Sequence, residues 1–325
     1  MAEVADKAER GWRYWTLRGL VAAALLLFGY QFLRVGRELD WAAFVRALGR
    51  PGNWRYFAAV LLLMPLNWLL EARKWQLLLR PFLSWTFPKT LRVTLAGVSV
   101  SAATPNRIGE IGGRLLMADR EEVGGVVASS LLGSVCQWVA FLLLGWPALV
   151  YTLQQLPAGL LPELPWAWLY PLGPLLLLLA GIGGNALALS TLHWVERRFD
   201  QPTGDLRHSL TNVKFTLILR SSAYAGLRFG VYCTQLYLLL WFFGLELPLG
   251  TGLAGIAAIY LVQAGIPLPP GLNFVTRTEL GLLLWQAEAA GAVAVLAAYT
   301  ALFSVNVLLP SLPGYWWIVR KNGLR

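Results

Sequence analysis

Three charged residues stand close together in an apolar part of the sequence: Arg107, Glu110 and Arg114, within TPNRIGEIGGR. Their spacing of three and four residues places them on one face of a helix, so they can form one site. Two arginines against one carboxylate leave a net positive charge, and Arg holds a phosphate through two parallel hydrogen bonds. The pattern predicts a binding site for an anionic headgroup, which includes Asn106; an ion pair between Glu110 and Arg114 that only braces the segment is the alternative.

These charges also limit where the segment can lie. A charge at the centre of a membrane helix costs about 2.5 to 3.5 kcal/mol, whereas each large apolar residue returns about 0.3 to 0.6 kcal/mol. Three charges therefore outweigh the mostly small residues of the preceding arm, 93–103. We expect the segment to face protein or water, and because ionisable residues inside membranes mark function, a substrate site is favoured over a bracing pair.

A second polar group follows further along the chain, in PLPPGLNFVTRTE. Its candidate binding residues are Asn273, Arg277 and Glu279. For Glu279 a capping box with Thr276 is an equal alternative, in which the carboxylate only satisfies a helix N-terminus. Thr276 with Glu279 here, and Thr104 with Pro105 in the first group, predict helix N-termini, whose N–H groups and positive dipole ends favour an anion.

A weaker polar cluster occurs in NWLLEARKW. Asn67 and Glu71 lie deeper in the predicted helix and are candidate cavity-lining residues. Arg73 and Lys74 lie nearer the predicted membrane surface, where long basic side chains extend their charged ends to water. We expect that simpler role for both of them.

The composition places the chain among integral membrane proteins. Of its 325 residues, 57% are hydrophobic and only 14% are charged, whereas soluble domains carry about a quarter charged residues. Apolar runs of about 20 residues recur, which is typical of helical spans and not of membrane barrels. The net charge of +10 comes from basic residues scattered over short loops, so anionic lipid headgroups are expected partners and nucleic acid is not.

No pattern in the sequence supports an enzyme, a metal site or a cofactor. Cys136 and Cys233 each lie in an apolar run and are expected to be small packing residues. His193 and His208 have no carboxylate or cysteine cluster near them at metal-ligand spacing. Close helix packing is expected of a small-residue series: Gly124, Gly125, Ala128, Ser129 and Gly133.

The pattern of apolar runs predicts an all-α polytopic membrane protein. Six spanning helices are expected at 14–34, 55–79, 124–151, 168–192, 222–244 and 289–318. Two stretches, 92–119 and 251–286, are apolar but broken by proline and charge, and their arms are too short to cross a bilayer. We expect them to be re-entrant hairpins.

The same series of elements occurs twice, in 1–160 and again in 161–325. Each half has three crossings, so the second half is expected to be inverted relative to the first, as in many transporters. Basic residues in 193–221 and at the C-terminus, against none in 152–167, predict that both termini are cytoplasmic.

The sequence resembles the family named for the transmembrane region of lysylphosphatidylglycerol synthase. The resemblance is carried by NWLLEARKW at 67–75, PNRIGEIGGR at 105–114 and PLPPGLNFVTRTE at 267–279. It implies a flippase-like protein of a bacterial or archaeal cytoplasmic membrane that handles phospholipids or lipid-linked glycans. Bifunctional relatives also carry a soluble aminoacyl-transfer domain after the membrane region; because the sequence ends at Arg325, we expect no such domain, and the resemblance does not imply lysyl transferase activity here.

Two functions remain open at this point. The first is a flippase that moves an anionic phospholipid or lipid-linked glycan headgroup between leaflets, through a midplane site between the two hairpins. The second is an accessory subunit or enzyme that presents a lipid-linked substrate to a glycosyl- or aminoacyltransferase. A membrane-associated glycosyltransferase and a second copy of the chain are the expected protein partners of these two functions.

Overall fold

The computed structural model describes residues 41–101, 108–156, 169–177, 179, 190, 213–265, 270–285 and 289–323. All the regular elements within this part of the chain are helices, which confirms the expected all-α class. The predicted span 14–34 lies outside the described residues. Of the predicted span 168–192, residues 169–177 are described, and they are helical.

The described elements fall into two series. The first contains α2 (Trp41–Gly49), α3 (Trp54–Leu79), α4 (Phe87–Ser101), α5 (Ile108–Met117), the 3₁₀ turn η2 (Arg120–Glu122), α6 (Val123–Ala140), the π-turn η3 (Phe141–Gly145) and α7 (Trp146–Gln154). The second contains α10 (Phe215–Phe243), α11 (Leu249–Ala264), α12 (Pro270–Trp285), α13 (Ala289–Phe303), the π-turn η4 (Ser304–Leu308) and α14 (Leu309–Gly323).

Three of these helices are long and apolar enough to cross a membrane. They are Trp54–Leu79, Arg120–Gln154 and Gly291–Lys321. They confirm the spans expected at 55–79, 124–151 and 289–318. The span expected at 222–244 lies within α10, a helix of 29 residues, which at about 1.5 Å per residue is also longer than a bilayer core.

Local sequence signals set several of the helix ends. Asp119 and Glu122 form a capping box before α6, which satisfies backbone N–H groups that would otherwise lack a partner. Gly244 ends α10 with a φ of 95°, a left-handed conformation that glycine adopts without strain. Pro248 precedes α11, where its missing N–H disturbs no helical hydrogen bond. These signals fix where each short helix begins relative to the long helix beside it.

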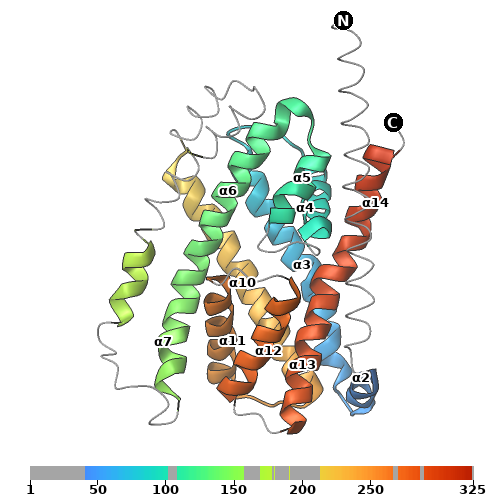
Figure 1. Cartoon of the computed structure of the whole chain (residues 1–325), viewed down its shortest axis with the longest axis vertical. Coiled ribbons are helices and arrows are strands. Elements are labelled where there is room, and N and C mark those ends of the chain that lie inside the picture. The colour runs from blue at the N-terminus through green and yellow to red at the C-terminus, as the bar shows by residue number, and fades with distance from the viewer. Residues whose placement is uncertain are drawn as a thin grey trace, which may run out of the picture.

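The helices of the two series run in opposite directions (Figure 1). α3 rises through the view while α10, packed along it, descends, and α6–α7 descends while α13–α14 rises. The pair α4 and α5 lies in the upper half of the bundle, and the pair α11 and α12 lies in the lower half. Corresponding elements start 161 to 166 residues apart, from Trp54 against Phe215 to Val123 against Ala289.

The main hydrophobic core lies where α10, α11 and α13 meet α3. Leu236, Leu240, Ile256 and Leu302 have at most 1% of their surface exposed there. Burial of a large aliphatic side chain contributes about 1.5 to 3 kcal/mol, so this core holds the second series together and joins it to the first. Cys233 belongs to the same core, which agrees with its expected packing role.

Small residues let helices approach closely in the upper half of the bundle. The predicted small-residue series of α6 is buried throughout, and a Cβ on Gly125 would lie 2.9 Å from Leu83 Cγ. The same holds between α4 and α5, where a Cβ on Gly113 would lie 2.8 Å from Gly97 Cα. α5 is therefore held against α4 by backbone contact, in a position that any larger side chain at Gly113 would change.

We predict that Gly113→Ala lowers the free energy of unfolding by about 1 to 3 kcal/mol, because the methyl group forces α4 and α5 apart. Gly112 is the matched control: it is next in the same helix, and nothing lies within 4 Å of a Cβ built there. Gly112→Ala should raise stability by about 0.5 to 1 kcal/mol through helix propensity. Thermal unfolding of the purified protein in detergent measures both, and equal midpoints for the two variants would contradict the prediction.

Candidate functional site

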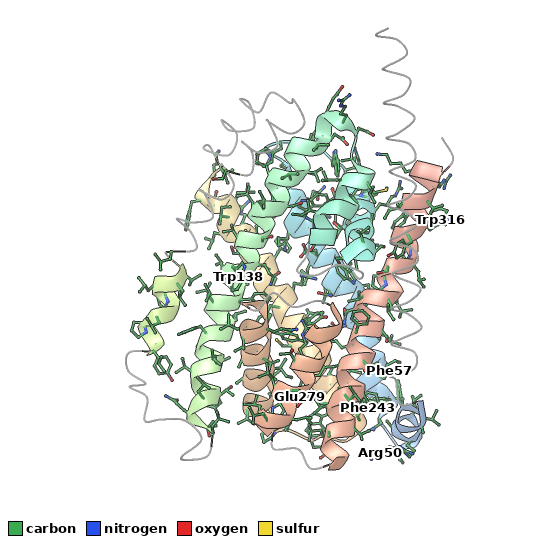
Figure 2. The ribbon with its side chains drawn as sticks, viewed as in Figure 1. Arg50, Phe57, Trp138, Phe243, Glu279 and Trp316 are labelled. Carbon is green, nitrogen blue, oxygen red and sulfur yellow. The ribbon has the colours of Figure 1, made fainter. Side chains whose placement is uncertain are left out.

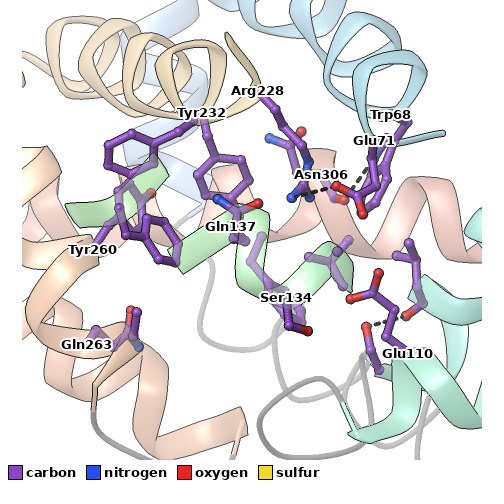
Figure 3. Close-up of a pocket in the computed structure, with 18 of the residues that line it drawn as sticks. Trp68, Glu71, Glu110, Ser134, Gln137, Arg228, Tyr232, Tyr260, Gln263 and Asn306 are labelled. Carbon is purple, nitrogen blue, oxygen red and sulfur yellow. Dashed lines mark hydrogen bonds and ion pairs between the residues drawn. The ribbon is translucent and has the colours of Figure 1, made fainter. Parts of the chain in front are cut away.

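A cavity of about 600 Å³ lies between the two pairs of short helices. Its walls include Ser101, the last residue of α4, and Ala264, the last residue of α11, together with residues of α3, α6, α10, α13 and η4. Figure 3 shows Tyr260 and Gln263 on one side of it and Glu71 and Glu110 on the other. Within the described part of the chain, the ionic residues that line it are Glu71, Glu110, Arg114, Arg228 and Arg277.

Glu71 of α3 is at the centre of a buried charge cluster. Its carboxylate lies 2.7 Å from Lys74 Nζ, 3.3 Å from Arg228 Nη1 and 3.4 Å from Arg114 Nη2. The side chain of Glu71 is only 3% exposed. One carboxylate thus serves three cations from three helices, which is the kind of pairing that a buried charge requires.

Arg114 of α5 connects this cluster to the first predicted site. Its Nη2 pairs with Glu110 as well as Glu71, and its Nη1 donates to Ser130 Oγ at 3.0 Å. The guanidinium also lies over the ring of Trp75, 4.1 Å from the ring centre. Glu110 and Arg114 therefore form the ion pair expected as the alternative to a substrate site, and both also line the cavity.

Arg228 of α10 is a site residue that the sequence analysis missed. Besides its contact with Glu71, its guanidinium lies 5.1 Å from the centre of the Trp68 ring. A signal was present, because Arg228 is a charged residue in the middle of the predicted span 222–244. Such residues are rare inside membranes and face the interior of the bundle.

The role expected of Lys74 is wrong. Its side chain is 1% exposed and is paired with Glu71, so its ammonium group does not extend to a membrane surface. Glu71 stands one turn earlier on the same inward face, and the buried carboxylate holds the lysine inside. Arg73 points elsewhere: it is exposed, and it packs over the ring of Phe87 at 4.0 Å.

Asn67 belongs to a buried chain of amide side chains. Its Nδ2 donates to Asn306 Oδ1 at 3.1 Å, and Asn306 Nδ2 donates to Gln235 Oε1 at 3.0 Å. The backbone carbonyl of Asn306, in the π-turn η4, accepts from Trp68 Nε1 at 3.1 Å. Asn306 lines the cavity whereas Asn67 lies behind it, so α3, α10 and η4 are fixed together at the cavity wall.

Arg277 of α12 lies on the other side of the cavity. Its Nε donates to Gln263 Oε1, and its guanidinium lies 4.9 Å from the centre of the Tyr260 ring. None of the ion pairs among the described residues includes Arg277. It is thus a cavity-lining cation whose contacts with the described side chains are neutral.

The remaining predicted site residues do not all come to the cavity. Glu279 is exposed, does not line the cavity, and lies toward the lower end of the bundle in Figure 2. Arg107 and Asn106 lie outside the described residues, as does the side chain of Asn273.

A family model for the lysylphosphatidylglycerol synthase transmembrane region matches residues 15–314. The chain belongs to that family. It is therefore a multi-pass integral membrane protein, and the resemblance given by the three sequence motifs is confirmed. In this member of the lysylphosphatidylglycerol synthase transmembrane-region family, each of those motifs contributes an ionic residue to one cavity: Glu71, Arg114 and Arg277. A search of the curated proteins finds no match for the chain.

We predict that Glu71→Gln destabilises the protein by about 3 to 5 kcal/mol, because the neutral amide leaves three buried cations without their shared carboxylate. Glu121→Gln makes the same chemical change at an exposed residue and should shift stability by at most about 0.5 kcal/mol. Thermal unfolding in detergent compares the two. A Glu71→Gln protein as stable as the Glu121→Gln protein would show that the cluster does not hold α3, α5 and α10 together.

Proposed function

We propose that the protein is a flippase that moves the anionic headgroup of a phospholipid or lipid-linked glycan between leaflets through this cavity. The observation that carries the proposal is Arg277, a cation in the cavity wall whose described partners are neutral. An anionic headgroup would supply the opposite charge. The hydrocarbon tails would stay in the surrounding lipid during the transfer.

The balance of charge supports an anionic ligand. Among the described residues, three arginines and two carboxylates line the cavity, and Lys74 adds one more positive charge behind Glu71. Arg114 and Arg228 are already in contact with carboxylates. Arg277 differs from them, because it has no carboxylate partner among the described residues. Arg groups bind phosphate oxygens through charge-assisted hydrogen bonds.

The size and lining of the cavity suit an amphipathic headgroup. Binding sites for small molecules measure about 300 to 1,000 Å³ and combine apolar walls with a few polar groups. Here Trp68, Phe141, Phe229 and Phe303 supply apolar walls beside the ionic residues. A glycerophosphate or sugar phosphate fits this volume, whereas two long acyl chains do not.

The two pairs of short helices are proposed to be re-entrant hairpins related by an inverted repeat. α4 and α5 have 15 and 10 residues, and α11 and α12 have 16 each; helices this short fall below the roughly 30 Å of a bilayer core. Support comes from the opposite helix directions and the constant spacing of elements in the two series. A cavity between opposed hairpins could open to each leaflet in turn.

The proposed location is the cytoplasmic membrane of a bacterium or archaeon, with both termini in the cytoplasm. This orientation rests on the basic residues of 193–221 and of the C-terminus. In the described part, Arg320 and Lys321 at the end of α14 are those terminal charges. They would lie among cytoplasmic headgroups, at the end of the bundle that holds α4 and α5 (Figure 1).

Translocation in proteoliposomes tests the function. Headgroup-labelled anionic and zwitterionic lipids are mixed into the vesicles, and a membrane-impermeant quencher reports the label that reaches the outer leaflet. We expect faster transfer of anionic lipid, and a drop of about tenfold or more in Arg277→Gln, because a hydrogen bond to a charged group contributes about 1.5 to 3 kcal/mol.

Arg320→Gln is the matched control, because Arg320 is exposed and packs on Trp316 at the end of α14. It should translocate lipid like the wild type. Folded Arg277→Gln protein that transfers anionic lipid at the wild-type rate would contradict the proposed role of the cavity.

A further inference from the structure

Two tyrosine hydroxyl groups in the cavity wall have no hydrogen-bond partner among the described residues. They belong to Tyr260 of α11 and Tyr299 of α13. The two residues are 5% and 2% exposed. A buried hydroxyl without a partner costs about 1 to 3 kcal/mol, and such groups are rare enough that each one requires an explanation.

Arg277 lies over the ring of Tyr260 and lines the same cavity as Tyr299. Its Nε is taken by Gln263, so the two Nη groups are its donors toward a ligand. The phenol hydroxyls keep their protons at neutral pH and are donors as well. Guanidinium and phenol donors from α11, α12 and α13 thus converge on one region.

The opposite side of the cavity has a different character. There Glu71 and Glu110 already occupy Arg114, and Glu71 also contacts Arg228 and Lys74. On that side Arg114 Nε and Arg228 Nε also have no hydrogen-bond partner among the described residues, but both guanidinium groups already contact a carboxylate. On the Arg277 side an anion would meet donors that have no acidic partner among the described residues. The two sides of the cavity are therefore unequal as anion sites.

We infer that Arg277, Tyr260 and Tyr299 form an oxyanion subsite that binds the phosphate of the lipid headgroup. This inference rests on the proposed function and adds the place at which the phosphate is held. The tyrosines are specificity residues: their O–H groups donate hydrogen bonds to phosphate oxygens, which accept them through their lone pairs. The ion pairs of the Glu71 cluster then have a structural role, which is to position α5 and α10 against α3.

The test uses the purified full-length protein in detergent and three probes. Dihexanoyl phosphatidylglycerol carries the phosphate on a lipid, dihexanoylglycerol is the same lipid without phosphate, and inorganic phosphate is the group alone. Tyr260→Phe and Tyr299→Phe remove one hydroxyl each. Tyr237→Phe is the matched control, because the Tyr237 hydroxyl donates to the carbonyl of Leu247 at 2.9 Å and does not line the cavity.

For Tyr260→Phe and Tyr299→Phe, we expect the unfolding temperature without ligand to stay the same or rise, and the affinity for the phospholipid to fall. Without ligand, Tyr260→Phe and Tyr299→Phe should unfold at the wild-type temperature or above it, because each removes an unsatisfied buried group, whereas Tyr237→Phe should unfold below it. Affinity for dihexanoyl phosphatidylglycerol should fall roughly tenfold for each of the two cavity variants and stay unchanged in Tyr237→Phe. Dihexanoylglycerol should bind more weakly than the phospholipid to the wild type.

Three results would overturn the inference or part of it. If both cavity variants bind the phospholipid with wild-type affinity, the tyrosines do not bind the phosphate. If the wild type binds both lipids equally, the phosphate does not contribute to binding. Inorganic phosphate that binds as tightly as the phospholipid, with the same loss in both variants, would support the subsite and reject the lipid as its source.

The binding test of the subsite and the translocation test of the proposed function can fail independently. If Tyr260→Phe and Tyr299→Phe leave the affinity for the phospholipid unchanged while Arg277→Gln still slows translocation, the flippase function is supported and the tyrosine subsite is not. If the tyrosines control affinity but no lipid is translocated, the subsite stands and the flippase assignment falls.

Discussion

The structure depends on one requirement: a carboxylate removed from water must be surrounded by cations. Glu71 is nearly inaccessible and contacts Lys74, Arg114 and Arg228. Removing one charge from water costs several kcal/mol, and good geometry with several partners returns that energy. Because the three partners come from α3, α5 and α10, the position of each of these helices is tied to the other two. The wall of the cavity is a consequence of this arrangement.

Apolar packing and polar contacts stabilise different regions of the bundle. Where α10, α11 and α13 meet α3, the contacts are between aliphatic and aromatic side chains. Such contacts stabilise the packing but do not require one particular orientation of the groups. Where α4 and α5 pack, glycine lets the backbones touch, and the ion pairs of Arg114 set the orientation. The amide chain from Asn67 through Asn306 to Gln235 links the two regions. The cavity lies at the border between the directional contacts and the apolar core.

Much of the fold could be predicted from local patterns. Hydropathy alone located three long helices within a few residues, and the spacing of Glu110 and Arg114 predicted that they share a helix face. What could not be predicted depends on contacts distant in sequence: Asn67 and Asn306 are 239 positions apart. Lys74 shows the same limit, because only the packing of α3 against α10 decides that it faces inward while its neighbour Arg73 faces outward. Nothing in the sequence singles out Tyr260, in the predicted hairpin 251–286, or Tyr299, in the predicted span 289–318, and only the structure brings both to the cavity that Arg277 lines.

The π-turn η4 interrupts the last long helix, and α3 contacts the chain at this turn. In a π-turn the backbone hydrogen bonds join residues i and i+5 instead of i and i+4. Within this turn the carbonyl of Asn306 accepts a hydrogen bond from the indole of Trp68 in α3. The helices α13 and α14, which η4 separates, are therefore linked to α3 at this turn. Because Asn306 also lines the cavity, one residue connects the cavity wall, α3 and the last long helix, and in the first series the π-turn η3 separates α6 from α7.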